Sequence, residues 1–156
     1  MFPVFYLAVL GAGGVFTASN PAYTATELSH HLRISRAKFI ITESLQLPIV
    51  RDAASYTGID SDHIFLFNDT EVEVDSAHTS IQQLMSYGPS KWTTFDDMKR
   101  STSTIANLNT TSGTTGLPKM AARSHHSLVT EHQAIEEVNT KLYDVSVIFT
   151  HITTRD

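Results

Sequence analysis

A run of small and hydroxyl-bearing residues, placed directly after a strand pattern, constrains this chain more than any other feature. Residues 105–110 predict a strand, and residues 110–116 then hold five Ser or Thr and two Gly in seven positions. Glycine lets backbone N–H groups turn towards a ligand because no Cβ stands in the way. Ser and Thr hydroxyls add donors for anionic oxygens, and Lys119 adds a mobile positive charge. The run therefore predicts a loop that cradles the phosphates of a nucleotide.

The spacing of the glycines excludes the Walker A loop. That pattern, Gly-x-x-x-x-Gly-Lys-Ser/Thr, places its glycines further apart. Here two residues separate Gly113 from Gly116, Pro118 precedes the lysine, and Met120 follows it. A P-loop NTPase fold is therefore a poor explanation. A Ser/Thr-rich surface turn without a ligand is the other alternative, and the preceding strand and the lysine at the end disfavour it.

Residues 108–119 read Leu-Asn-Thr-Thr-Ser-Gly-Thr-Thr-Gly-Leu-Pro-Lys. At every position this stretch resembles the phosphate-loop signature of the adenylate-forming (AMP-binding) superfamily. That superfamily includes acyl-CoA synthetases, 4-coumarate-CoA ligases, luciferases and peptide-synthetase adenylation domains. Three stretches between residues 13 and 42 also look like 4-coumarate-CoA ligase-like members. The resemblance runs from about residue 2 to about residue 146 and is weakest over residues 68–104.

The resemblance implies an ATP-dependent acyl-CoA ligase that works in two steps. A small-molecule carboxylic acid attacks the α-phosphate of ATP to give an acyl-adenylate and pyrophosphate, and coenzyme A then takes the acyl group. In the family the loop holds the β- and γ-phosphates, with Mg²⁺ expected beside them, and fixed donors stabilise the charge. The resemblance assigns phosphate contacts, and for the lysine charge stabilisation, to these residues: Thr111, Ser112, Gly113, Thr114, Thr115, Gly116 and Lys119.

The sequence departs from the family pattern at two places. Met120 stands where most members have glycine, whereas Ser124-His125 matches the Ser/Thr-His pair that usually follows. Residues 147–156 do not fit the aromatic-His motif expected there, and the neighbours of His151 differ from it. The adenine-binding and ribose-binding segments and the C-terminal domain with its catalytic lysine find no match. We therefore expect residues 1–156 to be a partial AMP-binding domain that is inactive alone, and no catalytic residue is assigned.

Apolar runs that alternate with helical patterns predict an α/β fold with a mainly parallel sheet and flanking helices, part of the large N-terminal domain of an adenylate-forming enzyme. Thr24 and Glu27 form a capping-box pattern, and Gly58 is placed to end a helix that begins near Pro48. Residues 91–104 are read mostly as surface loop. Strands are expected at residues 15–17, 39–42, 63–67 and 105–110, and helices at residues 5–10, 24–32, 49–56, 81–87 and 124–138.

The uncharged stretch at residues 1–18 allows three interpretations. A signal peptide needs a positive start, and a transmembrane helix needs about twenty apolar residues. Gly11, Gly13 and Gly14 interrupt the run before that length is reached. The favoured interpretation is a buried helix, a glycine turn and a buried strand, with no stable membrane span.

Charge and composition exclude several classes of function. The net charge of −5 argues against a nucleic-acid partner, because such proteins usually carry a basic face. Without cysteine there is no disulfide, thiolate metal site or cysteine nucleophile. Metal binding by the eight histidines is not expected, since the adjacent pairs His30-His31 and His125-His126 would point apart on a helix.

Two hypotheses from different classes remain open. The chain is either a piece of an acid-thiol ligase, or a non-catalytic or vestigial protein that keeps only the phosphate-binding loop. A cytoplasmic location is expected. Family relatives are also peroxisomal, but Thr154-Arg155-Asp156 is not a peroxisomal tripeptide of the Ser-Lys-Leu kind.

Overall fold

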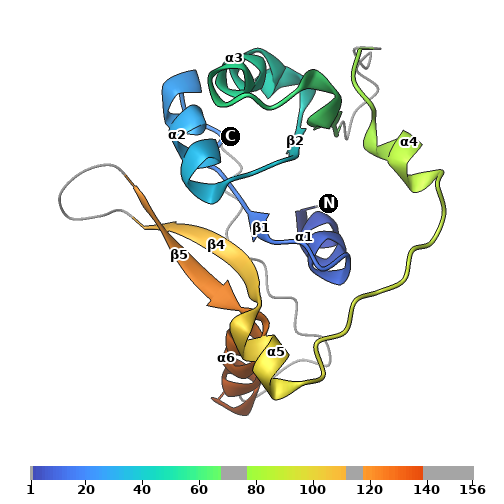
Figure 1. Cartoon of the computed structure of the whole chain (residues 1–156), viewed down its shortest axis with the longest axis vertical. Coiled ribbons are helices and arrows are strands. Elements are labelled where there is room, and N and C mark those ends of the chain that lie inside the picture. The colour runs from blue at the N-terminus through green and yellow to red at the C-terminus, as the bar shows by residue number, and fades with distance from the viewer. Residues whose placement is uncertain (1, 68–76, 112–117, 139–156) are drawn as a thin grey trace.

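The computed structural model describes residues 2–67, 77–111 and 118–138, and it is a mixed α/β structure (Figure 1). The α-helices are α1 (Phe2–Gly11), α2 (Ala25–Ser35), α3 (Leu47–Thr57), α4 (Ile81–Met85), α5 (Met98–Ser103) and α6 (His125–Val138). Two short 3₁₀ turns are η1 (Ser44–Gln46) and η2 (Ser61–His63). The strands are β1 (Phe16–Thr17), β2 (Ile40–Thr42), β3 (Ile64–Leu66), β4 (Ile105–Thr111) and β5 (Lys119–Ser124).

The strands form two small sheets. One has the order β1-β4-β5, in which β1 and β4 are parallel and β4 and β5 are antiparallel. The other pairs β2 with β3 in parallel. The predicted α/β class is confirmed, and both pairings that join strands distant in sequence are parallel. The antiparallel pair arises because the chain reverses between β4 and β5 and returns beside itself as a hairpin.

The best-packed part of the core lies between α2, α3 and the β2–β3 sheet. It consists of buried aliphatic side chains from these elements: Leu28, Leu32, Leu47, Val50, Ala53, Ala54, Ile64 and Leu66. Leu28 and Leu32 stand four residues apart on α2, so their helical spacing places both on the face that meets α3. The predicted apolar stripe of this helix is therefore confirmed.

Local sequence signals set the ends of α2 and α3. The Thr24 side chain accepts a hydrogen bond from the Glu27 backbone N–H, and the Glu27 carboxylate accepts one from the Thr24 backbone N–H, which completes the predicted capping box. Pro48 stands in the first turn of α3, where its missing N–H costs nothing. Gly58 ends α3 with φ +73°, a left-handed conformation that a side chain would strain.

Three predictions of burial are wrong in the described residues. The first helix forms but is not buried, since Leu7 is 53% exposed and only Gly11 of α1 is buried. The strand predicted at residues 15–17 is not buried, because Val15 is 49% exposed and both residues of β1 are partly exposed. The strand predicted at residues 39–42 is likewise not buried, because Phe39 before β2 is 60% exposed and Ile41 within β2 is 40% exposed. Residues 91–104 are mostly without regular structure, as predicted, but include α5, and β5 was not among the predicted strands. None of the described helices combines the length and the apolar character needed to cross a membrane.

Candidate functional site

The predicted phosphate loop is the connection of the β4–β5 hairpin (Figure 1). At the end of the hairpin next to the loop, Thr111 pairs with Lys119, and the Thr111 hydroxyl donates a hydrogen bond to the Lys119 carbonyl at 3.4 Å. Both residues are exposed. The structure therefore brings the first and last of the predicted phosphate-binding residues together. The others lie outside the described residues: Ser112, Gly113, Thr114, Thr115 and Gly116.

Strand β4 anchors the first side of this loop inside the sheet. It lies between β1 and β5, with Phe16 opposite Asn107 and Thr17 opposite Leu108. Ala106 is fully buried and Asn107 is 7% exposed, so these two residues of β4 are part of the interior. The last three residues of β4 are exposed, and the strand therefore carries the chain from the interior to the surface where the loop begins.

His31 on α2 reaches this same strand through β1. The Thr17 hydroxyl donates a hydrogen bond to the Leu108 carbonyl at 3.0 Å, which uses its only proton. Thr17 Oγ1 must therefore accept from His31 Nε2, 3.1 Å away. His31 is 2% exposed, and its Nδ1 has no hydrogen-bond partner among the described residues. Burial, with a smaller contribution from neighbouring His30, lowers the pKa of His31, so its neutral form is favoured.

His30 on α2 reaches the other side of the loop. Its Nε2 lies 3.1 Å from the Pro118 carbonyl oxygen, and because a carbonyl only accepts, Nε2 carries the proton and donates it. Pro118 directly precedes Lys119, and both His30 and Pro118 are partly buried. The two adjacent histidines of α2 thus connect to both flanks of the predicted loop, His30 directly and His31 through Thr17. Sequence patterns indicated no metal role for this pair, and they gave no sign of these contacts.

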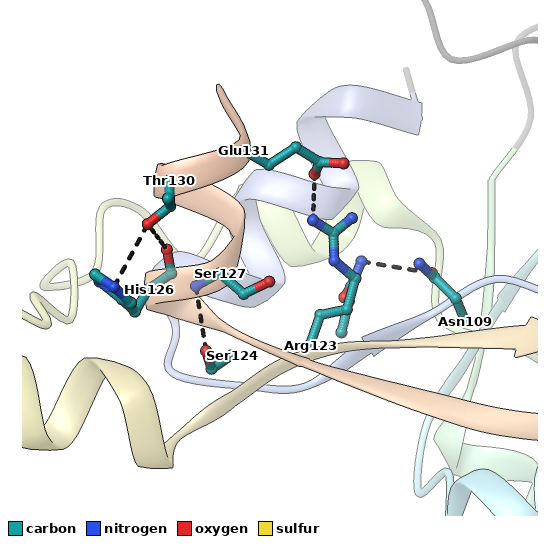
Figure 2. A network of polar contacts seen from close by, with 8 residues as sticks. Asn109, Arg123, Ser124, His126, Ser127, Thr130 and Glu131 are labelled. Carbon is teal, nitrogen blue, oxygen red and sulfur yellow. Dashed lines mark hydrogen bonds and ion pairs between the residues drawn. The ribbon is translucent and has the colours of Figure 1, made fainter. Parts of the chain in front are cut away.

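The far end of the hairpin is secured to α6 by polar contacts. Figure 2 shows Arg123 of β5 beside Glu131 of α6, with which it forms an ion pair. The Ser124 hydroxyl accepts a hydrogen bond from the Ser127 backbone N–H at 3.2 Å, which satisfies a free N–H of the first turn of α6. On α1, burial raises the pKa of Tyr6; the charge of Arg123 opposes this shift and the charge of Glu131 adds to it. These contacts hold β5 against α6.

A small pocket lies at the start of α6, beside the segment that precedes α5. The His125 ring stacks on the Phe95 ring with centroids 3.7 Å apart, and the Arg100 guanidinium lies 5.0 Å from the centroid of the Phe95 ring. Burial lowers the pKa of His125, and its Nε2 has no hydrogen-bond partner in the part of the chain that the structure describes. The pocket has a volume of about 360 Å³, and its lining includes Trp92 and Asp96.

Metal-ligand geometry occurs at one place in the described part of the chain, away from the hairpin. Asp60, Asp62 and His63 around η2 offer ligand atoms within 4.8 Å of one another, and the two aspartates are exposed. No signal in the sequence pointed to this group. No comparable set of acidic or histidine side chains converges on the described residues of the hairpin.

Comparison with known proteins gives one consistent result. The family described as AMP-binding enzyme matches residues 1–153. An acyl-CoA synthetase of Alternaria alternata, ACTT5, is 37% identical over 135 residues, which cover 86% of this chain and 23% of that protein. A phenylacetyl-CoA ligase of Aspergillus niger, epaB, is 31% identical over 151 residues, which cover 94% of this chain and 28% of that protein.

The fold has solved counterparts as well. A red-emitting luciferase from Phrixothrix hirtus superposes with a TM-score of 0.72 at 22% identity, over 88% of this chain and 34% of that protein. An identity this low speaks for the fold alone. This chain spans about a quarter of the length of the two curated relatives it matches.

Proposed function

We propose that this chain, which belongs to the AMP-binding enzyme family, carries the ATP phosphate-binding loop of an AMP-forming acyl-CoA ligase. The relatives named acyl-CoA synthetase and phenylacetyl-CoA ligase support this activity. The observation that carries the proposal is the β4–β5 hairpin, which brings Thr111 and Lys119 together at the exposed end of a strand that is buried at Ala106 and Asn107. Directly opposite residues of an antiparallel pair carry their side chains on the same face, which supports a site where a triphosphate meets both Thr111 and Lys119.

The phosphate contacts are assigned to Thr111, Ser112, Gly113, Thr114, Thr115 and Gly116, and Lys119 is assigned the neutralisation of phosphate charge. Residues 108–119 form the loop of an AMP-binding domain to which residues 1–156 contribute. Lys119 is exposed at the first position of β5, so its side chain is free to meet a ligand beyond the hairpin end.

The substrates of the proposed reaction are ATP, a small-molecule carboxylic acid and coenzyme A. The carboxylate displaces pyrophosphate from the α-phosphate of ATP, and the coenzyme A thiol then displaces AMP from the acyl-adenylate. The described hairpin residues do not make a magnesium site of their own, because no set of carboxylates converges there. Mg²⁺ would therefore enter bound to the triphosphate, and no step of the proposal depends on protein ligands for it.

A non-catalytic protein that binds nucleotide phosphates is the second candidate. The same hairpin supports it, because phosphate binding needs only the loop. The two candidates differ in whether the chain takes part in acyl-adenylate formation, which pyrophosphate exchange dependent on an added carboxylic acid would reveal.

Titration calorimetry of the purified chain tests the shared part of the proposal. MgATP should bind, and AMP, which lacks the β- and γ-phosphates, should bind far more weakly. Lys119→Met should weaken MgATP binding about tenfold, the effect of losing a charge-assisted contact. Lys38→Met is the matched control, since Lys38 is an exposed lysine in the turn before β2. Equal affinity of wild type and Lys119→Met for MgATP would contradict the assignment of Lys119.

A further inference from the structure

We infer that the adjacent histidines His30 and His31 are positioning residues that hold the two flanks of the phosphate loop at a fixed separation. The functional consequence rests on the proposed function, because it concerns how Lys119 is presented to a triphosphate. The contacts that hold the flanks are formed by the described residues. His30 contacts one flank directly and His31 reaches the other through Thr17, and both flanks are far from α2 in the sequence.

His31 holds the first flank through a relay of two hydrogen bonds. Its Nε2 donates to Thr17 Oγ1, and the Thr17 hydroxyl donates to the Leu108 carbonyl, which is the first residue of the loop motif. Leu108 also pairs with Thr17 in the parallel ladder of β1 and β4. The relay is buried around His31, so water competes poorly for these bonds.

His30 holds the second flank directly. Its Nε2 donates to the carbonyl of Pro118, which is separated from His30 by 88 positions in the sequence. Proline lacks an N–H, so the Pro118 backbone can be held only through its carbonyl. A bond at this carbonyl fixes the peptide that leads into Lys119.

One rigid helix therefore sets the geometry of both flanks. Successive helical residues point about 100° apart, which lets neighbouring side chains reach different strands. The capping box fixes the start of α2, and Leu28 and Leu32 anchor the helix in the core. The ring nitrogens that face the loop are both occupied as donors to protein oxygens. The pair consequently holds the two flanks of the loop at a fixed separation, and its geometry does not suit a shared metal ion.

Limited trypsin digestion of the whole chain tests the His30 contact without any ligand. Lys119 is a trypsin site immediately after Pro118, and the exposed Lys38 is an internal reference in the same molecule. His30→Ala should raise the cleavage rate at Lys119, relative to Lys38, about fivefold, the factor expected for one ordinary hydrogen bond. His30→Gln keeps an N–H donor and should restore the wild-type ratio. His132→Ala removes an exposed histidine on α6 and should leave the ratio unchanged.

A relay variant tests the other flank. Thr17→Val keeps the shape of the side chain but removes both hydrogen bonds of the relay. It should raise hydrogen exchange at the backbone amides around Leu108, and exchange in α3 should stay at the wild-type rate. Unchanged cleavage at Lys119 in His30→Ala, or unchanged exchange around Leu108 in Thr17→Val, would overturn the inference for that flank.

MgATP titration then separates the positioning role of the histidines from the proposed function. His30→Ala should bind MgATP about fivefold more weakly than wild type and His30→Gln, with equal melting temperatures. If wild type binds no MgATP while the digestion results hold, the proposed function fails and the positioning role stands. If wild type binds MgATP, and His30→Ala shows neither faster cleavage nor weaker binding, the positioning role fails and the proposed function stands.

Discussion

At the scale of single residues, the direction of each hydrogen bond shows which ring nitrogen of a histidine carries the proton, and His78 is a clear case. Its Nδ1 lies 3.1 Å from the Ser61 carbonyl, which can only accept, so Nδ1 carries the proton. Its Nε2 therefore accepts from Arg51, with Nε at 3.2 Å and Nη2 at 3.0 Å. His78 is 5% exposed, and it links η2, α3 and the segment before α4.

His78→Leu should lower the free energy of unfolding by about 1–3 kcal/mol, because it removes the hydrogen bonds that the buried His78 side chain makes to the charged Arg51 and to the Ser61 carbonyl. Urea unfolding monitored by circular dichroism measures this. His132→Leu, at an exposed position on α6, is the matched control and should change stability little. A His78→Leu variant as stable as wild type would show that these contacts are not formed in solution.

Two histidines, the buried His31 and the partly buried His125, give the chain a defined response to acid. Burial lowers the pKa of both His31 and His125 below the ordinary 6.5. The unfolded chain therefore takes up protons before the folded one does, and stability is fully present above pH 6.5 and falls as the pH drops towards the lowered pKa values. Melting temperatures at pH 7.5 and 5.5 measure the loss. His31→Gln, which keeps an N–H donor but does not titrate, should shrink the difference; an unchanged difference would exclude His31 as its source.

At the scale of elements, the helices with local end signals were the predictable ones. Thr24 with Glu27 and Pro48 with Gly58 define ends that need no tertiary contact, and α2 and α3 form where these signals place them. Strand β5 lacks any such signal, since Lys119–Ser124 has no apolar alternation and becomes a strand only by pairing with β4. Helix α5 is equally hidden, because its polar sequence shows no stripe and only the Asp97 cap marks its start.

The capping box of α2 should be worth a measurable part of the stability. Thr24→Ala removes the hydroxyl that accepts from Glu27 N–H and should lower the free energy of unfolding by about 1 kcal/mol. Thr26→Ala, two positions later on an exposed site of the same helix, is the control and should be neutral or slightly stabilising. Equal losses in the two variants would mean that helix propensity, and not the cap, sets this end.

At the scale of the whole molecule, the α/β class and the parallel pairings followed from the sequence. The burial expected for the first helix and for the first two strands did not. Apolar runs such as residues 39–42 were expected inside, and the expectation assumed elements on both faces of each sheet. Within the described residues the β2–β3 sheet has two strands, and the ring of Phe39, just before β2, contacts His63 and Phe65 while remaining 60% exposed. An apolar run in the sequence shows that its side chains are apolar, but which elements cover those side chains depends on the assembled molecule.

The exposed apolar side chains lead to a prediction for the purified chain. On α1 three of them, Phe2, Val4 and Leu7, are 39–59% exposed, and the helix carries no charge to offset them. Apolar surface of this kind should drive self-association, which multi-angle light scattering would detect as a mass rising with concentration. Val4→Lys with Leu7→Glu places a charge pair on α1 and should return the mass towards the monomer value of 17.2 kDa. Thr130→Lys with Gln133→Glu, a charge pair with the same spacing on the exposed face of α6, should not. A monodisperse wild-type monomer with a cooperative melt would show that the chain keeps α1 covered in solution.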